Sequence, residues 1–322
     1  MRASVLIPVK NGGPLFGEVL DAVLAQRAPW PFEILVTDSG STDESVSIAK
    51  ERGIDVRIIA PHEFGHGRTR NALAERATGE FLVFLTQDAK PASDAWLRHL
   101  VEGCDVDPAV AGAFGPHRAY LHARHITHRE LKEHFSGFGS ALTVTRMDDE
   151  ERFKSDPGYR QYLHFFSSNN SCIRRSVWEK IPLPEVAFAE DQTWALQVTK
   201  CGYSKAFVPE AVVFHSHDFG IWETLQRNFD EARSFEQYFG YQMQSGFFRV
   251  LKSGLSLARR DWNWLRAAGL RGWSLFKNGV YMTGIECARV FGQFLGARHE
   301  NVPIWVLSIV SRDERLQRGV RV

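Results

Sequence analysis

The most informative segment is Phe81-Leu82-Val83-Phe84-Leu85-Thr86-Gln87-Asp88-Ala89, because its run of apolar residues ends abruptly on a carboxylate. Such a run predicts a buried strand that carries one acid at its carboxyl end. Residues 33–38 repeat the pattern and end on Asp38, which precedes a turn and a helical stretch. In open α/β sheets the carboxyl ends of the strands line the crevice where ligands bind. The two acids therefore predict a shared polar ligand.

Short apolar runs alternate with helical stretches through the first third of the chain. The expected strands are residues 4–9, 34–37, 56–60, 81–86 and 111–114, and the expected helices are residues 16–26, 44–52, 69–77 and 94–103. This alternation predicts an α/β fold of the Rossmann-like type, in which a mainly parallel sheet has helices on both faces.

The remaining sequence predicts an insertion and then a helical region. Residues 120–165 are less regular and rich in His, Arg and acids, as expected of an insertion. A helix over residues 193–201 and a strand over residues 211–214 follow, and beyond them the pattern is helical to about residue 298. We therefore expect one domain over residues 1–218 and a helical C-terminal region over residues 219–322.

Length and composition indicate an ordinary globular protein. The 322 residues are 44% hydrophobic, which is enough for about two domains with a real core. The first apolar run, residues 5–9, is too short for a signal peptide, and no run approaches the roughly 18 apolar residues of a membrane span. We therefore expect a cytoplasmic protein.

The net charge of +1 conceals a split between the two regions. Residues 1–220 carry 24 Lys and Arg against 29 Asp and Glu, a net of −5, whereas residues 221–322 carry 15 against 9, a net of +6. Within residues 247–277 there are seven cations, one acid and six large aromatic residues. Basic charge mixed with aromatics fits a helix on the surface of an anionic membrane. Docking on the first domain or on a second subunit, as in a homodimer, explains the aromatics equally well, and no nucleic-acid recognition module is visible.

At this point the ordered motifs resemble a known family. The chain is similar, over roughly residues 3–218, to the GT-A fold glycosyltransferases of family 2, and residues 64–71 with residues 86–89 most resemble the bacterial rhamnosyltransferase branch. The residues that carry the resemblance are the segment 7–11, the turn 38–43, Arg70-Asn71, Asp88, Glu190-Asp191 and the segment 215–217.

Transfer of a sugar from a nucleoside diphosphate requires neutralisation of the departing diphosphate, and a bound Mg²⁺ or Mn²⁺ is the usual solution. Asp88 is the expected ligand, although Gln87 stands where the family's Asp-X-Asp motif has its first acid. The resemblance favours His215 as a second ligand, with His217 as the alternative. Because strand residues alternate, we expect the two rings to point to opposite faces. Alternatively, both histidines are ordinary polar residues at the end of a strand and bind no metal.

An inverting transferase also needs a carboxylate that takes the proton of the acceptor hydroxyl. The resemblance assigns this role to Asp191, and a helix N-terminus favours the ionised form of such an acid. An N-terminal capping role without chemistry is the alternative. Glu190 and Asn169 are expected on the acceptor side, as is the insertion over residues 120–165.

The resemblance also implies a donor site. Asp38 is expected to bind the nucleobase or ribose, Pro8 and Val9 to supply backbone contacts, and Ser39 stands where relatives have a second acid. Arg70 is expected to meet the diphosphate, or else to pair on the surface with Glu75 or Glu63. Gln87 is expected to contact ribose or sugar. Asp43 is expected to cap the helix over residues 44–52 and to bind no ligand.

The resemblance thus implies a metal-dependent, inverting glycosyltransferase that moves L-rhamnose from dTDP-rhamnose to a glycan or polyprenyl-linked glycan of a bacterial surface polysaccharide. The same fold acting on a UDP-hexose is the alternative among enzymes. A non-catalytic nucleotide-sugar-binding protein is the alternative of another class. A nucleotidyltransferase is disfavoured, because residues 10–14 make a poor phosphate loop.

Overall fold

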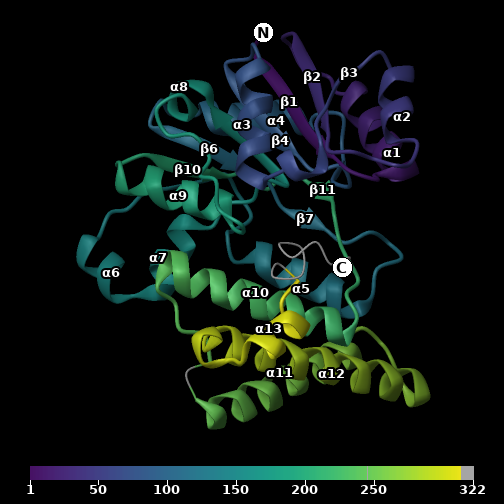
Figure 1. Cartoon of the computed structure of the whole chain (residues 1–322), viewed down its shortest axis with the longest axis vertical. Helices are drawn as coiled ribbons and strands as arrows, with labels where there is room; N and C mark the ends of the chain where they lie inside the picture. The colour runs from purple at the N-terminus through teal and green to yellow at the C-terminus, as the bar shows by residue number, and fades with distance from the viewer. Residues whose placement is uncertain (245, 313–322) are drawn as a thin grey trace. The chain divides into compact units, whose positions relative to one another are not determined.

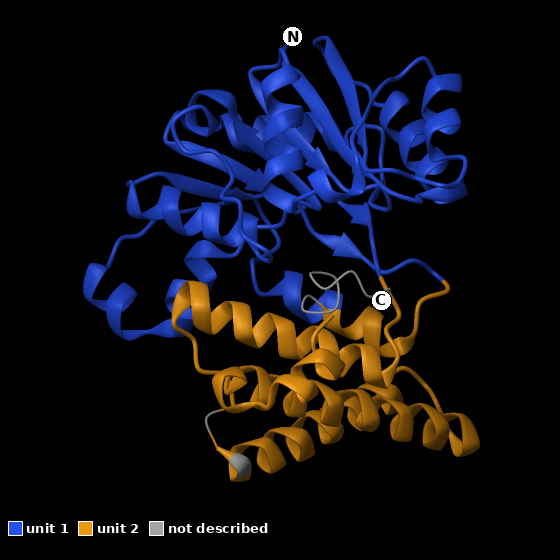
Figure 2. Ribbon diagram, in the orientation of Figure 1, with its two compact units in different colours: residues 1–121, 131–216 blue, residues 122–130, 217–322 orange. Residues whose placement is uncertain are grey.

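The computed structural model describes residues 1–244 and 246–312, and its secondary structure is labelled in Figure 1. It divides into two compact units: unit 1 comprises residues 1–121 and 131–216, and unit 2 comprises residues 122–130 and those from 217 onward (Figure 2). Residues 245 and 313–322, which belong to the predicted helical C-terminal region, lie outside the described residues. The predicted division into domains over residues 1–218 and 219–322 stays a prediction.

Unit 1 is built on an eight-stranded sheet. Its order is β3 (Asp55–Ile58), β2 (Phe32–Asp38), β1 (Ala3–Val9), β4 (Phe81–Leu85), β9 (Asn170–Arg174), β6 (Val110–Phe114), β10 (Ser204–Phe207) and β8 (Thr143–Thr145). Strands β9 and β8 are antiparallel to their neighbours, and the other pairs are parallel. The predicted, mainly parallel α/β sheet is confirmed.

Side chains of alternate strand residues enter two different cores, one on each face of the sheet. In β4, Val83 joins a core with α1 (Gly13–Leu24), α2 (Ser45–Glu51) and α4 (Trp96–Asp105). The neighbouring Phe84 joins the other core, with α3 (His66–Arg76), α8 (Arg175–Trp178) and α9 (Glu190–Lys200). All five residues of β4 are buried, because helices cover both faces. This explains why its sequence is continuously apolar.

The strand predicted over residues 211–214 is shorter than expected. Only Val213–Phe214 form β11, which pairs with β5 (Lys90–Pro91) and β7 (His117–Arg118) in a small second sheet. Because β11 ends at Phe214, the residues that follow are not in a strand.

The segment over residues 120–165, whose sequence pattern is less regular, is more ordered than that pattern suggests. The segment contains α5 (His125–Ser136), α6 (Glu150–Ser155) and α7 (Pro157–His164), besides β8. Asp149 and Asp156 cap α6 and α7 by accepting backbone N–H groups with their carboxylates. An aspartate directly before a helical stretch is a sequence signal for a helix start. Here many other charged residues surround the two aspartates and make this signal hard to recognise.

Unit 2 is helical, as predicted. It contains α10 (Ile221–Phe239), α11 (Phe247–Ala267), α12 (Gly272–Gly296) and α13 (Ile304–Val310); short 3₁₀ turns lie at Pro61–Glu63 in unit 1 and His299–Asn301 in unit 2. Helix α12 packs closely on α10 because two of its residues lack a side chain. A Cβ atom on Gly292 would lie 2.4 Å from the carbonyl oxygen of Leu225, and one on Gly296 would lie 2.2 Å from that of Phe229. Alanine at either position would force the helices apart.

The acids of the α11–α12 pair lie inside unit 2. Arg129, from the start of α5, contacts Asp261 at 2.9 Å and Glu286 at 2.8 Å, and all three side chains are almost fully buried. Burial raises the pKa of Asp261 to about 7, although the Arg129 charge acts in the opposite direction. Buried carboxylates require such partners, because an unpaired charge in a protein interior is costly.

Candidate active site

The site begins where β1, β2 and β4 end side by side. Val9 pairs in register with Asp38, and β1 also pairs in parallel with β4. The side chain of Gln87 connects the loops beyond β1 and β4: it accepts from the N–H of Lys10 at 2.7 Å and donates to the Lys10 carbonyl at 3.1 Å. Both ends of the Gln87 amide are thus bonded to the backbone. A contact of Gln87 with ribose or sugar stays a prediction.

Asp38 has one carboxylate oxygen committed to its own turn and one that is not. Oδ1 accepts from the N–H groups of Gly40 and Ser41, each at 2.9 Å. Oδ2 is buried and has no hydrogen-bond partner among the described residues. A buried carboxylate oxygen without a partner is costly unless a ligand supplies a donor. This arrangement suits the predicted contact of Asp38 with a nucleobase or ribose.

Two other predicted donor residues belong to the same edge. The N–H and hydroxyl of Ser39 both donate to the Val9 carbonyl, at 2.9 and 3.2 Å. Pro8 precedes Val9 in β1 and is half-buried. Asp43 is not itself the N-cap, since α2 begins at Ser45, but its carboxylate accepts the Ser45 N–H at 3.0 Å.

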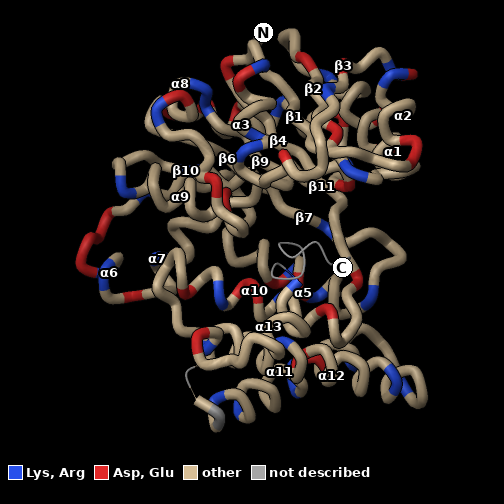
Figure 3. The backbone as a smooth tube through the Cα atoms, in the orientation of Figure 1, with Lys and Arg blue, Asp and Glu red and all other residues tan. Residues whose placement is uncertain are grey.

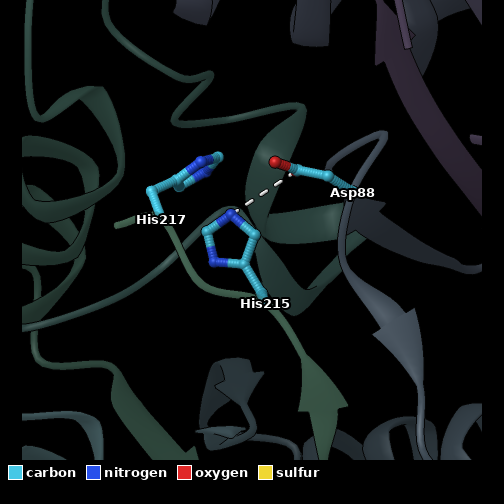
Figure 4. A group of neighbouring side chains, drawn as sticks. All are labelled: Asp88, His215 and His217. Atoms are coloured by element: carbon cyan, nitrogen blue, oxygen red, sulfur yellow. Dashed lines mark ion pairs between the residues drawn. The ribbon is translucent and has the colours of Figure 1, made fainter. Parts of the chain in front are cut away.

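Asp88, His215 and His217 converge (Figure 4). One ligand atom of each lies within 4.8 Å of the others, and His215 Nε2 lies 3.4 Å from Asp88 Oδ1. His217 is the first residue of unit 2, two residues beyond His215 along the chain. The expectation that the two rings point to opposite faces is wrong. Strand alternation does not apply here, because β11 ends before His215.

Residues that sequence analysis missed hold this group in place. The hydroxyl of Tyr120 donates to the Asp88 carbonyl at 3.1 Å, and the N–H of His215 donates to the Arg118 carbonyl at 2.9 Å. The ring of His117 makes an edge contact with that of His215, at 5.1 Å between centroids. Burial lowers the pKa of His117 well below its ordinary value, which keeps this ring neutral. No pattern in residues 117–120 marks these roles, since they depend on the small second sheet.

Asp191 lies in the first turn of α9 and is held by backbone donors. Its Oδ2 accepts the Ser168 N–H at 2.9 Å, and its Oδ1 accepts the Gln192 N–H at 2.8 Å. Asn169, next to Ser168, accepts the Thr86 N–H through its carbonyl at 3.4 Å. The loop that holds Asp191 is therefore bonded to the segment between β4 and Asp88.

The pKa of Asp191 contradicts the simple expectation from helix polarity. Burial, followed by the charge of Glu190, raises the pKa of Asp191 to about 7, although the Ser168 N–H and the Arg70 charge lower it. A general base is most effective when its pKa lies close to the working pH. Desolvation therefore outweighs the helix N-terminus here and gives the carboxyl the pKa of a base that works near neutrality.

Arg70 and Glu190 form a buried ion pair at 3.1 Å, with both side chains less than a tenth exposed. The expected alternative for Arg70, a surface pair with Glu63 or Glu75, is wrong, because the arginine is buried against α9. Its contact with a diphosphate and the acceptor-side role of Glu190 stay predictions. In the structure the pair affects the pKa of Asp191: the Glu190 charge raises it and the Arg70 charge lowers it.

These groups define what the edge is able to do. One carboxylate and two imidazoles are suitable ligands for a divalent cation. Asp191 is suited to accept a proton from a hydroxyl, and Asp38 offers a buried acceptor. The arrangement fits transfer of a group from a diphosphate to a hydroxyl.

The sequence matches the family described as Glycosyl transferase family 2 over residues 4–181. It is 34% identical over 241 residues to the O-antigen chain rhamnosyltransferase RfbN of Salmonella typhimurium, which covers 71% of each chain. It is 30% identical over 237 residues to the O-antigen chain rhamnosyltransferase WbaN of Salmonella anatum, which covers 70% of each chain.

Solved structures share the fold at lower identity. The mannosyltransferase PcManGT from Pyrobaculum calidifontis, in complex with GDP-Man and Mn²⁺, is 18% identical with a TM-score of 0.56, over 93% of this chain and 86% of that one. S. aureus TarS residues 1–349, in complex with UDP-GlcNAc, is 14% identical with a TM-score of 0.54, over 99% and 93%. The predicted GT-A fold is confirmed.

The raised pKa of Asp191 predicts a pH-dependent stability change in Asp191→Asn. Between about pH 4 and pH 7 the folded carboxyl keeps a proton that the unfolded one has lost, so ionisation destabilises the fold as the pH rises. Asparagine does not ionise. Thermal unfolding should show Asp191→Asn more stable than wild type by on the order of 2 kcal/mol at pH 8, and much less so at pH 5. Exposed Glu210, changed to Gln, is the control; an equal difference at both pH values would contradict the assignment.

Proposed function

The chain belongs to glycosyl transferase family 2, and we propose that it moves L-rhamnose from dTDP-rhamnose, with inversion, to a glycan or lipid-linked glycan of a bacterial surface polysaccharide. The observation that carries the proposal is the meeting of Asp88, His215 and His217 beyond the carboxyl edge of the sheet. One carboxylate and two imidazoles gathered at such an edge are suited to hold the cation that accompanies a nucleotide-sugar diphosphate, and this supports the proposal.

A divalent cation fits the residues present. Asp88 supplies the hard oxygen ligand, and His215 and His217 supply nitrogens, so these three side chains would hold the ion. When bound, the cation neutralises the charge of the departing nucleoside diphosphate. The protein's own part is to fix the ligands: Tyr120 bonds the Asp88 carbonyl, and the Arg118 carbonyl bonds the His215 N–H.

Asp191 is the proposed general base. Its two carboxylate oxygens are oriented by the N–H groups of Ser168 and Gln192, and its pKa of about 7 leaves it partly ionised at neutral pH. An acceptor hydroxyl that binds beside it loses its proton as the sugar bond forms. A single displacement of this kind inverts the anomeric centre, converting a β-linked donor into an α-linked product.

Two relatives support rhamnose as the transferred sugar. RfbN and WbaN, which match about 70% of the chain, are named as O-antigen chain rhamnosyltransferases. A UDP-hexose donor remains the competing proposal, and the solved neighbours do not decide between them because their likeness extends to the fold alone.

The donor assignment predicts a preference that hydrolysis or transfer measures. A rhamnose site presents apolar atoms to the methyl group of a 6-deoxy sugar, whereas a hexose brings a hydroxyl to the same place. dTDP-rhamnose should therefore be turned over at least tenfold faster than UDP-glucose or UDP-galactose, with dTDP-glucose as the control for the nucleotide. A preference for either UDP-sugar would overturn the rhamnose assignment and leave the family unchanged.

The metal assignment predicts how donor binding responds to substitution. A donor that binds the native state raises the melting temperature by mass action. With dTDP-rhamnose this rise should require a divalent cation and disappear in Asp88→Ala. It should shrink in His215→Ala more than in His217→Ala, because the resemblance to the family favours His215 as the ligand. Exposed His62→Ala is the control. A rise in melting temperature that persists in the presence of EDTA would show that donor binding needs no cation and would contradict the metal assignment.

We also propose that unit 2 attaches to an anionic membrane surface through α11 and α12. Residues 247–296 contain eight Lys and Arg but only two acids, Asp261 and Glu286. Both acids are fully buried and paired with arginines, so the outer surface of the two helices carries no acid. The colouring in Figure 3 shows cations spread along both helices. Attraction to anionic headgroups contributes on the order of 1 kcal/mol per cation near the surface.

Apolar side chains are exposed on the same helices. Phe248 and Leu255 of α11 are 85% and 74% exposed, and Trp273 of α12 is 76% exposed and stacks on Phe276. Along α12, Trp273, Phe276 and Val280 follow helical spacing, so they occupy one face. No helix among the described residues is long and apolar enough to cross a membrane. The combination fits a surface that lies in the headgroup region.

Cosedimentation with liposomes tests the membrane proposal. The protein should bind vesicles that contain phosphatidylglycerol, bind neutral vesicles weakly, and be partly released by 0.5 M salt, because only the electrostatic attraction is screened. Neutralising four exposed cations should reduce binding at least tenfold: Lys252, Arg259, Arg266 and Lys277, each to Gln. Arg260 is left intact because it pairs with buried Glu286.

The matched control neutralises four exposed cations of unit 1: Lys50, Arg57, Lys180 and Lys200. This variant should bind anionic vesicles as wild type does. Equal losses in both variants would mean that net charge, and not this surface, governs binding. Wild-type protein that ignores anionic vesicles at low salt would overturn the proposal and favour a protein contact.

A further inference from the structure

We infer that a cavity within unit 2 binds a neutral sugar ring of the acceptor; the inference rests on the proposed glycosyltransferase function. The cavity has a volume of about 150 Å³ and is walled by α10, α12, the segment 124–130 and the segment 217–219. Drug-sized ligands occupy roughly 300 to 1,000 Å³, so this space suits a single ring and is too small for a nucleotide.

The cavity wall is charged but balanced. Three arginines face three carboxylates: Arg124, Arg227, Arg289, Glu130, Asp218 and Glu231. Most of these charges are already paired. Arg289 contacts both Glu130 and Glu286, and Asp218 accepts from the Arg124 N–H and, at 2.6 Å, from the Thr127 hydroxyl. An anion such as phosphate therefore gains little here, whereas a ligand with many neutral hydroxyl groups finds both donors and acceptors.

Glu231 is the exception, and it points to a ligand. It lies on the same face of α10 as Arg227 and Asn228, four and three residues away. Among the described residues it has neither a hydrogen bond nor an ion pair, although it is half-buried. Burial raises its pKa, and the nearby charges of Arg289 and Arg227 lower it. A carboxylate in this position is satisfied when a ligand hydroxyl donates to it.

Apolar and aromatic groups complete the wall. Ile126 and Ile285 line the cavity, and the Phe219 ring carries the Arg227 guanidinium 4.2 Å above its centroid. A sugar ring has an apolar C–H face as well as hydroxyls, and such a mixed wall suits it.

His217 belongs both to the cavity lining and to the proposed metal site. This residue lines the cavity and is also one of the three converging metal-ligand candidates, and its ring stacks on that of Phe219 at 5.6 Å. The donor residues proposed above, from Pro8 to Asp88, all belong to unit 1, whereas the cavity is made of unit 2 residues. The cavity shares no residue with the proposed donor contacts, so we assign it to the other substrate, the acceptor.

Binding of small glycosides tests the inference. Saturation-transfer NMR on the full chain, with methyl α-L-rhamnoside, methyl α-D-galactoside and methyl α-D-mannoside as probes, should detect millimolar binding of at least one. Glu231→Gln should weaken that binding about tenfold, because it removes a charged acceptor. Arg227→Met is a second variant with the same expectation. Glu236→Gln is the matched control: it lies on α10, pairs with His299 and is outside the cavity.

The possible results separate this inference from the proposed function. Binding that is equal in wild type and Glu231→Gln would overturn the cavity assignment, as would binding of inorganic phosphate in place of every glycoside. Turnover of dTDP-rhamnose by wild-type protein is measured in parallel. Donor turnover without glycoside binding would overturn the cavity as an acceptor site and would leave the proposed glycosyltransferase activity unaffected. Glycoside binding without any donor turnover would instead contradict the proposed function.

Discussion

The parallel pairing of β1 with both β2 and β4 is the constraint on which the rest of the site depends. It places the ends of three strands at one edge, and the two hydrogen bonds between Gln87 and Lys10 fix the loops beyond them. Because of that alignment, Asp38 at the end of β2 and Asp88 in the loop after β4 lie at the same edge of the sheet. If β4 slipped by one residue, its side chains would exchange faces and both cores would be lost, so the register also holds the chemistry in place.

The site balances desolvation against preorganised dipoles. The Ser168 N–H and the start of α9 favour an ionised Asp191, yet burial and the Glu190 charge prevail and bring its pKa to about 7. Arg70 pairs with Glu190, and its positive charge limits the rise in the pKa of Asp191. The consequence is a base that holds its proton weakly enough to work near neutral pH. The same cost of burial appears in unit 2, where Arg129 partners two buried acids and leaves the surface of α11 and α12 cationic.

Local sequence was enough to predict the elements that carry their own pattern. The apolar runs of β1, β4 and β6 and the helices of unit 2 were found because periodicity determines them. The helices α6 and α7 are not evident from the sequence, although Asp149 and Asp156 cap them, because the many charged residues hide the apolar periodicity of two short helices. The orientation of His217 was wrong because β11 ends early, which depends on pairing with β5 and β7. Tyr120 and His117 gave no signal, since their roles exist only after those strands meet.

The anomeric configuration of the product shows whether Asp191 activates an acceptor for a single displacement. Proton NMR of the first turnovers with dTDP-β-L-rhamnose should show an α-linked rhamnoside, and the signal should fall by roughly a hundredfold or more in Asp191→Asn while nucleotide binding persists. A β-linked first product would require two displacements through a covalent intermediate and would contradict the account, as would an Asp191→Asn protein with near-normal transfer.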